Sequence, residues 1–183
     1  MAAVNEKLME AAKAGTEVEI KVVLQNPGCN ALAKNKDGMT ALMWAAWRGN
    51  EACIELLLPV SDARAGDGSG MTALMYAALN GSADCAQLLL PASDALAKDH
   101  RGLTALMHAA SDGHAQCVRL LLPVSALGVR NDEGITASEY AMNKGRPEIA
   151  DIIDDYVLAQ SELSALSSLI VSGPPRKTPS RRV

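Results

Sequence analysis

Residues 38–58 read G-M-T-A-L-M-W-A-A-W-R-G-N-E-A-C-I-E-L-L-L, and the chain repeats this stretch with small changes. Gly70 opens G-M-T-A-L-M-Y-A-A-L-N-G, and Gly102 opens G-L-T-A-L-M-H-A-A-S-D-G. Corresponding residues of the three copies lie 32 positions apart, and a Pro follows each Leu-Leu-Leu triplet. Fainter copies precede these three and follow them from Gly134. The fixed spacing identifies a tandem repeat.

Each copy predicts two short helices joined by a tight turn. Thr40 can cap the first helix with its hydroxyl, and Gly49 stands where glycine commonly ends a helix. A second apolar run, from Cys53 to Leu58, has helical spacing and stops before Pro59, which cannot continue a helix. The small polar residues that follow predict a protruding turn.

The copies are expected to stack on one another. Two short helices with leucine on one side cannot bury their own apolar surface, so each copy needs a neighbour. Alanine pairs at Ala45-Ala46, Ala77-Ala78 and Ala109-Ala110 would let adjacent helices approach closely, while the leucine triplets fill the layer behind. The pattern therefore predicts an all-α solenoid, a stacked and slightly curved rod.

These residues resemble the ankyrin repeat, whose pattern is roughly D-x-x-G-x-T-P-L-H-x-A-A-x-x-G-H over about 33 residues. The resemblance covers residue 5 to roughly residue 160, and the chain differs in placing Ala for Pro and Met for His within T-A-L-M. The T-A-L-M spelling is similar to that of ankyrin-repeat proteins of diplomonad protozoa. The resemblance implies an all-α ankyrin-repeat α-solenoid of helix-turn-helix pairs with protruding turns.

The repeat boundaries follow from the spacing. We expect an ankyrin repeat domain over residues 1–160, with copies at about 1–34, 35–66, 67–98, 99–130 and 131–160. The first and last copies are expected to be capping copies, because the ends of a stack need a polar outer face. Pro147 is expected at the first position of the last copy's second helix, and Asn5 before the first helix of the chain.

The C-terminal part predicts a helical extension over residues 161–172 and a flexible basic tail over residues 173–183. An apolar segment that begins at Leu158 and ends at Val171 has no evident surface to cover. We consider two interpretations of this helix: it folds back on the stack, or it pairs with another chain, including a second copy. Disorder is the third alternative.

Composition and charge argue against several classes of function. Four of the 17 basic residues lie in the last ten residues, which hold no acid, so the remainder carries 13 basic against 21 acidic residues. An acidic body disfavours nucleic acid as a partner. No run approaches the roughly 18 apolar residues that span a bilayer, and the first residues do not resemble a secretion signal. We expect no membrane association and a cytoplasmic location, with cytoskeletal association as a variant.

The recurring cysteines are expected to be packing residues. Cys53, Cys85 and Cys117 hold the same position in successive copies, so about one repeat spacing separates them, more than the ~7 Å between α-carbons that a disulfide tolerates. Small buried cysteines fit the thin layers of such a stack.

Catalytic, cofactor and metal sites are not expected. His108, Ser111 and Asp112 superficially offer a catalytic triad, but the matching positions two copies earlier hold Trp, Trp and Arg, which indicates ordinary variation within a repeat. The glycines of G-D-G-S-G lack the strand-to-helix setting of a nucleotide site, and no Cys, His or acidic spacing matches a zinc or calcium site. We therefore expect no small-molecule substrate.

Positions that vary between copies are the candidate partner-binding residues, because the resemblance implies that inner-helix positions and turn tips line a concave binding face. The inner-helix positions, here called the variable face, are Trp44, Trp47, Arg48, Tyr76, Leu79, Asn80, His108, Ser111, Asp112, Tyr140, Asn143 and Lys144. The turn-tip candidates are Lys36, Met39, Met71, Arg101 and Leu103. Trp47 and Arg48 are the expected anchors, since large aromatics and Arg dominate protein interfaces. The alternative is that Trp44, Tyr76 and Tyr140 only pack between copies.

These observations predict a non-enzymatic protein–protein interaction module or scaffold that binds a protein partner through its concave face. Two alternatives remain open. One is an accessory ankyrin protein of a kinase or ubiquitin-ligase system, and the other is a structural component that self-associates through the C-terminal helix. The variable residues do not name the partner.

Overall fold

The structure is a computed structural model that describes residues 2–172, with side chains described up to residue 167. Within this part of the chain there are α-helices and short 3-10 turns and no strand, which confirms the all-α prediction. The helices are α1 (Ala2–Ala14), α2 (Glu17–Leu24), α3 (Ala41–Arg48), α4 (Glu51–Leu57), α5 (Ala73–Asn80), α6 (Ala83–Leu89), α7 (Ala105–Asp112), α8 (Ala115–Leu121), α9 (Ala137–Asn143) and α10 (Pro147–Ser172). The 3-10 turns are η1 (Leu58–Val60), η2 (Leu90–Ala92) and η3 (Leu122–Val124).

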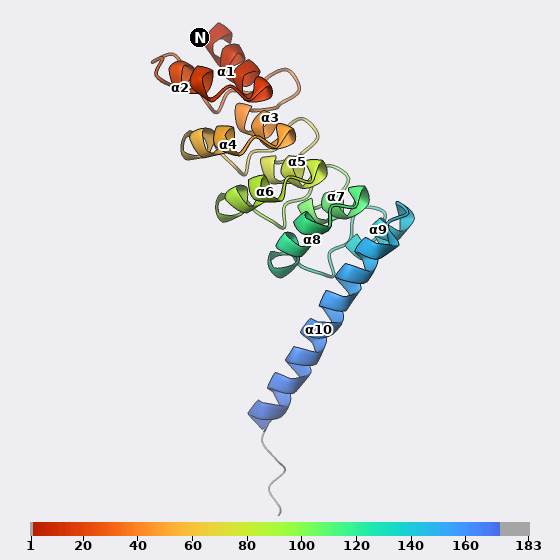
Figure 1. The fold of residues 1–183 in the computed structure, drawn as a ribbon. Helices are drawn as coiled ribbons and strands as arrows, with labels where there is room; N and C mark the ends of the chain where they lie inside the picture. The colour runs from red at the N-terminus through yellow and green to blue at the C-terminus, as the bar shows by residue number, and fades with distance from the viewer. Residues whose placement is uncertain (1, 173–183) are drawn as a thin grey trace, which may run out of the picture.

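The helices form two rows (Figure 1). One row runs α1, α3, α5, α7 and α9, and each of these helices packs on the next. The second row runs α2, α4, α6 and α8, and the first part of α10 closes it against α8 and α9. Each antiparallel helix pair therefore stacks on its neighbours, as a solenoid requires.

Threonine and glycine delimit the first helix of each copy, as predicted. The threonine hydroxyl accepts a hydrogen bond from the backbone N–H three residues later, which satisfies a free donor at the helix start. The pairs are Thr40–Met43 (3.3 Å), Thr72–Met75 (3.4 Å), Thr104–Met107 (3.4 Å) and Thr136–Glu139 (3.3 Å). Gly49, Gly81 and Gly113 end α3, α5 and α7 in the left-handed conformation that glycine adopts without strain.

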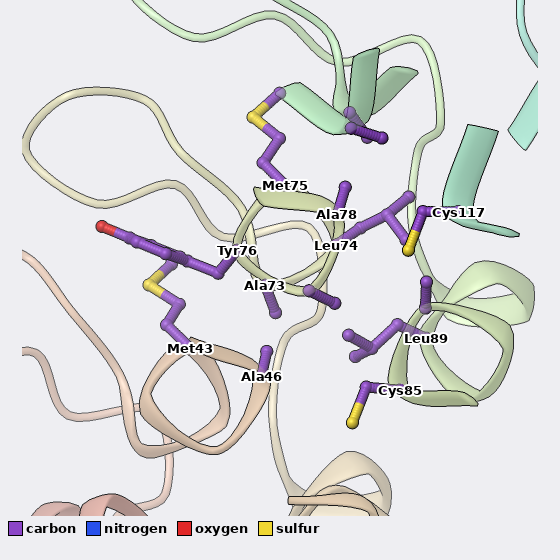
Figure 2. Close-up of a cluster of buried hydrophobic side chains, with 14 of the residues drawn as sticks. Met43, Ala46, Ala73, Leu74, Met75, Tyr76, Ala78, Cys85, Leu89 and Cys117 are labelled. Carbon is purple, nitrogen blue, oxygen red and sulfur yellow. The ribbon is translucent and has the colours of Figure 1, made fainter. Parts of the chain in front are cut away.

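The core consists of thin layers between the two rows. Figure 2 shows Ala46 of α3 and Ala73 of α5 pointing toward each other, with no bulk to separate the two helices. Leu89 of α6 is fully buried beside them, in the layer where Cys85 also lies. The three recurring cysteines are buried and free, which confirms the packing role, and burial raises the pKa of Cys117 to about 11.

Two expectations about the chain ends are wrong. Helix α1 begins at Ala2, so Asn5 lies inside the helix, where its side-chain oxygen accepts a hydrogen bond from the backbone N–H of Asn30 at 2.9 Å. Helix α10 begins at Pro147 as predicted, but it continues as one straight helix that projects beyond the stack instead of folding back (Figure 1). The predicted basic tail, residues 173–183, lies outside the described residues. None of the described helices is both long enough and apolar enough to cross a membrane.

Candidate functional site

A short polar residue organises each protruding loop. One carboxylate oxygen of Asp67 accepts hydrogen bonds from the backbone N–H groups of Ser69 (2.8 Å) and Met71 (2.9 Å). Asp99 repeats this arrangement one copy later, and the amide oxygens of Asn35 and Asn131 do so in the copies that open at those residues. These bonds hold the loop in a compact turn before the helix that follows.

Neighbouring loops are joined by backbone hydrogen bonds. The bonds run from Gly68 N–H to Asp37 O (2.9 Å), from His100 N–H to Ser69 O (2.9 Å) and from Asp132 N–H to Arg101 O (3.1 Å). Lysine ammonium groups add two further links, which donate in the opposite direction: Lys34 to the carbonyl of Gly66 and Lys98 to that of Arg130. The loops therefore form one continuous ridge along the edge of the stack.

In the two copies that open with Asp, the second carboxylate oxygen contacts the variable face. The Tyr76 hydroxyl donates to Asp67 Oδ2 at 2.6 Å, and His108 Nε2 lies 3.0 Å from Asp99 Oδ2. An ionised carboxylate only accepts hydrogen bonds, so the proton of the His108 ring must be on Nε2. The same residue thus shapes the loop and fixes the variable side chain nine positions later.

These contacts change the ionisation of the groups involved. Burial and the adjacent Asp67 carboxylate raise the pKa of Tyr76 well above its ordinary value. Burial would raise the pKa of Asp67, but the hydrogen bonds from Tyr76, Ser69 and Met71 outweigh it, and the pKa is lowered. Burial lowers the pKa of His108, although the Asp99 carboxylate opposes that effect. His108 is therefore a neutral, structurally engaged imidazole at neutral pH.

Five of the residues expected to contact a partner are buried. Met39 and Leu103, expected at turn tips, are 5% and 1% exposed, and Tyr76, His108 and Tyr140 are 9%, 7% and 6% exposed. These side chains pack between copies, so the alternative interpretation holds for the two tyrosines. The residue after the loop glycine is Met, Met, Leu or Ile in every copy, and this uniform apolar choice was the overlooked signal of burial.

The remaining candidates reach the surface to different degrees. Trp44, Met71, Leu79 and Ser111 are half-buried. Lys36, Trp47, Arg48, Asn80, Arg101, Asp112, Asn143 and Lys144 are exposed. The exposed set follows the row α3, α5, α7 and α9 and its loops, so the fold brings these residues to one side of the stack.

Three aromatic rings form a continuous surface, here called the aromatic shelf: Trp44, Trp47 and Tyr76. The two indoles stack with centroids 5.1 Å apart and planes at 29°, and Trp47 contacts Tyr76 of the next copy at 5.8 Å and 34°. The Lys13 ammonium lies 4.9 Å from the centroid of Trp44, at the outer end of the shelf. Offset ring pairs and a cation over a ring are both attractive arrangements. The sequence analysis missed Lys13, which comes from the fainter first copy.

A shallow notch adjoins the shelf at its outer end. Helix α1 lines one side with Glu6, Met9, Glu10 and Lys13, and Asn35 and Trp44 line the other. The notch has a volume of about 220 Å³. It places two carboxylates and an ammonium next to the face of an indole, so this part of the surface has both apolar and charged character.

A second polar cluster lies at the other end of the row. Arg101 Nη2 lies 3.4 Å from the Tyr140 hydroxyl, and the Lys144 ammonium lies 5.3 Å from the centroid of the same ring. Both cations are exposed. They place two exposed cations around the buried ring of Tyr140 at this end of the variable face.

The side chains that resembled a triad do not form one. The Ser111 hydroxyl donates to the backbone carbonyl of His108 (3.1 Å) and lies 2.9 Å from Asp112 Oδ1. The ring of His108 is turned to Asp99 instead. A nucleophile hydrogen-bonded to its base, which such chemistry needs, is therefore not assembled by these groups. Within the described residues, no group of three or more Cys, His or acidic side chains is placed to hold a metal ion.

Comparison with known proteins agrees with this architecture. The family model described as ankyrin repeats (three copies) matches residues 8–99 and again residues 92–157. The two matches together extend from α1 to the first part of α10, so they include every stacked helix pair. A search of curated proteins found no match to the chain.

Proposed function

The chain belongs to the ankyrin-repeat family, and on that premise we propose that it is a non-enzymatic module that binds a protein partner through its concave, variable face. Ankyrin repeats generally mediate protein–protein interaction and are generally not catalytic. The stack offers the means for such binding, since it presents a long side of exposed residues on rigid helices.

The observation that carries the proposal is the exposure of Trp47 on the aromatic shelf. Its side chain is 43% exposed while Trp44 and Tyr76 hold its ring on two sides. A large aromatic that is fixed before binding loses little conformational entropy on contact, which favours its use as an anchor. Arg48 is exposed next to it and adds a charged hydrogen-bond donor.

The proposal assigns contact to the exposed members of the variable face and not to the buried ones. Trp47 and Arg48 act as the anchors, and other exposed members such as Asn80 and Lys36 add contacts elsewhere on the same side. The mixed charge beside Trp44 in the notch favours a partner segment that combines an apolar side chain with polar groups. Tyr76 and His108 support this surface from beneath.

The test is capture of binding partners with three forms of the protein. The wild type is compared with a Trp47→Ala/Arg48→Ala variant and with a control variant, Glu55→Ala/Gln87→Ala, whose changes lie on exposed positions of α4 and α6. We expect the control to retain the wild-type partner and the Trp47/Arg48 variant to lose at least about tenfold in affinity, the magnitude of one interface anchor. Equal retention by both variants, with unchanged circular dichroism, would contradict the proposal.

A further inference from the structure

Helix α10 has two halves with opposite environments. In the first half, Ile149 and Ile153 are buried, and Tyr156 is half-buried against the core. In the second half, Leu163 and Leu166 are 59% and 57% exposed. Figure 1 shows this half extending away from the stack, without another element of the chain beside it.

The apolar spacing along α10 does not change where the stack ends. Steps of three and four residues alternate through Ile149, Ile152, Tyr156, Ala159, Leu163, Leu166 and Ile170. This is the spacing of the seam in a two-helix coiled coil. The seam begins at the rim of the covered face, where Ile149 is buried and Ile152 and Tyr156 are half-buried, and it continues as exposed residues at Ala159, Leu163 and Leu166.

Ion pairs do not stabilise the projecting half. Between Val157 and Ser172 the sequence holds one charged residue, Glu162, and no basic one, so no pair of opposite charges supports the helix. An isolated helix of this length is marginal in water. Contact along the apolar seam would supply the missing stabilisation.

We propose that the projecting half of α10 pairs antiparallel with the same segment of a second copy. With Leu163 opposite its own counterpart, Ala159 of each copy lies opposite Leu166 of the other, so a small side chain faces a large one at both outer layers. Such alternation lets the two helices interdigitate without a gap. An overlap of about three layers is small compared with most specific interfaces, so we expect weak association, with a dissociation constant in roughly the micromolar range or above.

The charges of α10 favour the antiparallel arrangement. All its charged residues are acidic: Glu148, Asp151, Asp154, Asp155 and Glu162. Parallel pairing would place each acidic residue next to its own counterpart, which is unfavourable. Antiparallel pairing places the acidic first halves of the two helices at opposite ends of the dimer, away from each other.

The end of the stack leaves room for the second helix. A notch lined by Arg119, Leu122, Ile152, Asp155 and Tyr156 lies between α8 and α10, where the covered part of the seam gives way to the exposed part. At this notch Arg119 and Leu122 of α8 and the turn after it lie beside α10. The stack therefore limits the overlap to the projecting half.

Sedimentation velocity of the full chain at two concentrations, one below and one well above the expected dissociation constant, tests the proposal. We expect the wild type to shift from monomer to dimer, and Leu163→Lys/Leu166→Lys to weaken association more than tenfold and remain monomeric at both. The control Val18→Lys/Val22→Lys changes two exposed apolar residues of α2 and should dimerise like the wild type. A wild type that stays monomeric, or a dimer that tolerates the two α10 changes, would overturn the proposal.

Cysteine cross-linking tests the orientation. A mixture of Ala159→Cys and Leu166→Cys proteins should form a disulfide-linked heterodimer on mild oxidation, while Ala159→Cys alone should not. Efficient cross-linking of Ala159→Cys alone would show parallel pairing and overturn the antiparallel arrangement. The three core cysteines are buried and should not interfere, and the half-buried Cys29 is replaced by Ser in every sample. Because Trp47 and Arg48 lie on another surface, these results are independent of partner binding.

Discussion

Asp99 is 8% exposed and its carboxylate accepts three hydrogen bonds, so replacing it by Ala should destabilise the stack strongly. The donors are the backbone N–H groups of Arg101 (2.8 Å) and Leu103 (2.9 Å) and Nε2 of His108 (3.0 Å). Leu103 is 1% exposed, so its N–H would lose its partner without gaining water. A buried unpaired donor costs about 1–3 kcal/mol, and the bond to His108 adds about 1 kcal/mol. We expect Asp99→Ala to lower the free energy of unfolding by about 2–4 kcal/mol.

Asp99→Asn is the matched control, because Asn35 and Asn131 already organise the loops of other copies. The amide oxygen keeps both backbone bonds, and only the charged contact with His108 is lost, so the expected cost is about 1 kcal/mol. Urea unfolding at neutral pH, followed by far-ultraviolet circular dichroism, measures both variants. The reasoning is refuted if the two variants lose equal stability, or if Asp99→Ala loses less than about 1 kcal/mol.

Three further predictions concern the core, the pH dependence and the loop glycines. Leu89→Ala should lower the free energy of unfolding in urea by about 2–5 kcal/mol, because Leu89 is fully buried. Leu158→Ala should lower it by less than about 0.5 kcal/mol, because Leu158 is 61% exposed. Similar losses for the two variants would contradict the assigned burial. Burial lowers the pKa of His108, so the unfolded chain binds a proton at this residue more readily than the folded chain, and the free energy of unfolding should fall as the pH drops below about 6.5. His108→Tyr, which copies the residue of the neighbouring repeat, should reduce this loss of stability between about pH 7.5 and pH 5.5. An unchanged pH profile of the variant would count against this prediction. Gly38→Ala should cost more than about 1 kcal/mol in thermal unfolding, because φ of Gly38 is +80° and a Cβ there would lie 2.5 Å from the backbone nitrogen of Gly68. Gly128→Ala should be neutral or stabilising, because no atom lies within 4 Å of the added Cβ. Equal effects of the two changes would be inconsistent with the loop geometry.

The repeat architecture was predictable because its determinants are local and occur several times. Thr40 and Gly49 bound a helix through contacts within a few residues, and their recurrence 32 positions later makes each assignment more secure. Stacking follows from the small size of the alanine pairs and the lack of any other cover for the leucines. Such features need no knowledge of how distant segments meet.

The candidate surface was less predictable because burial depends on neighbouring copies. Trp47 and Tyr76 are an example. Both are aromatic residues on the first helix of a copy, but Tyr76 is buried with its hydroxyl bonded to Asp67 of the preceding loop, whereas Trp47 is exposed. The surroundings of helix α10 were also hard to predict from sequence. Its apolar spacing indicates a covered face, but the pattern does not say whether the cover comes from the same chain.

Some of the expectations from sequence stay predictions. These are the domain edges at residues 160 and 172, the similarity of the T-A-L-M spelling to diplomonad proteins, the cytoplasmic or cytoskeletal location and the link to a kinase or ubiquitin-ligase system. One structural fact bears on the first: α10 crosses residue 160 without a break, so this edge lies within a continuous helix.

The dual use of the loop carboxylate restricts which sequences can diversify this surface. In copies where Asp opens the loop, the side chain nine positions later must donate a hydrogen bond to the carboxylate, as Tyr76 and His108 do. The two sites are thus expected to change together among related chains, a covariation that an alignment would reveal. A designer who randomises this protein to bind new targets should leave those pairs intact and vary the positions of Trp47 and Arg48, where the scaffold makes no such demand.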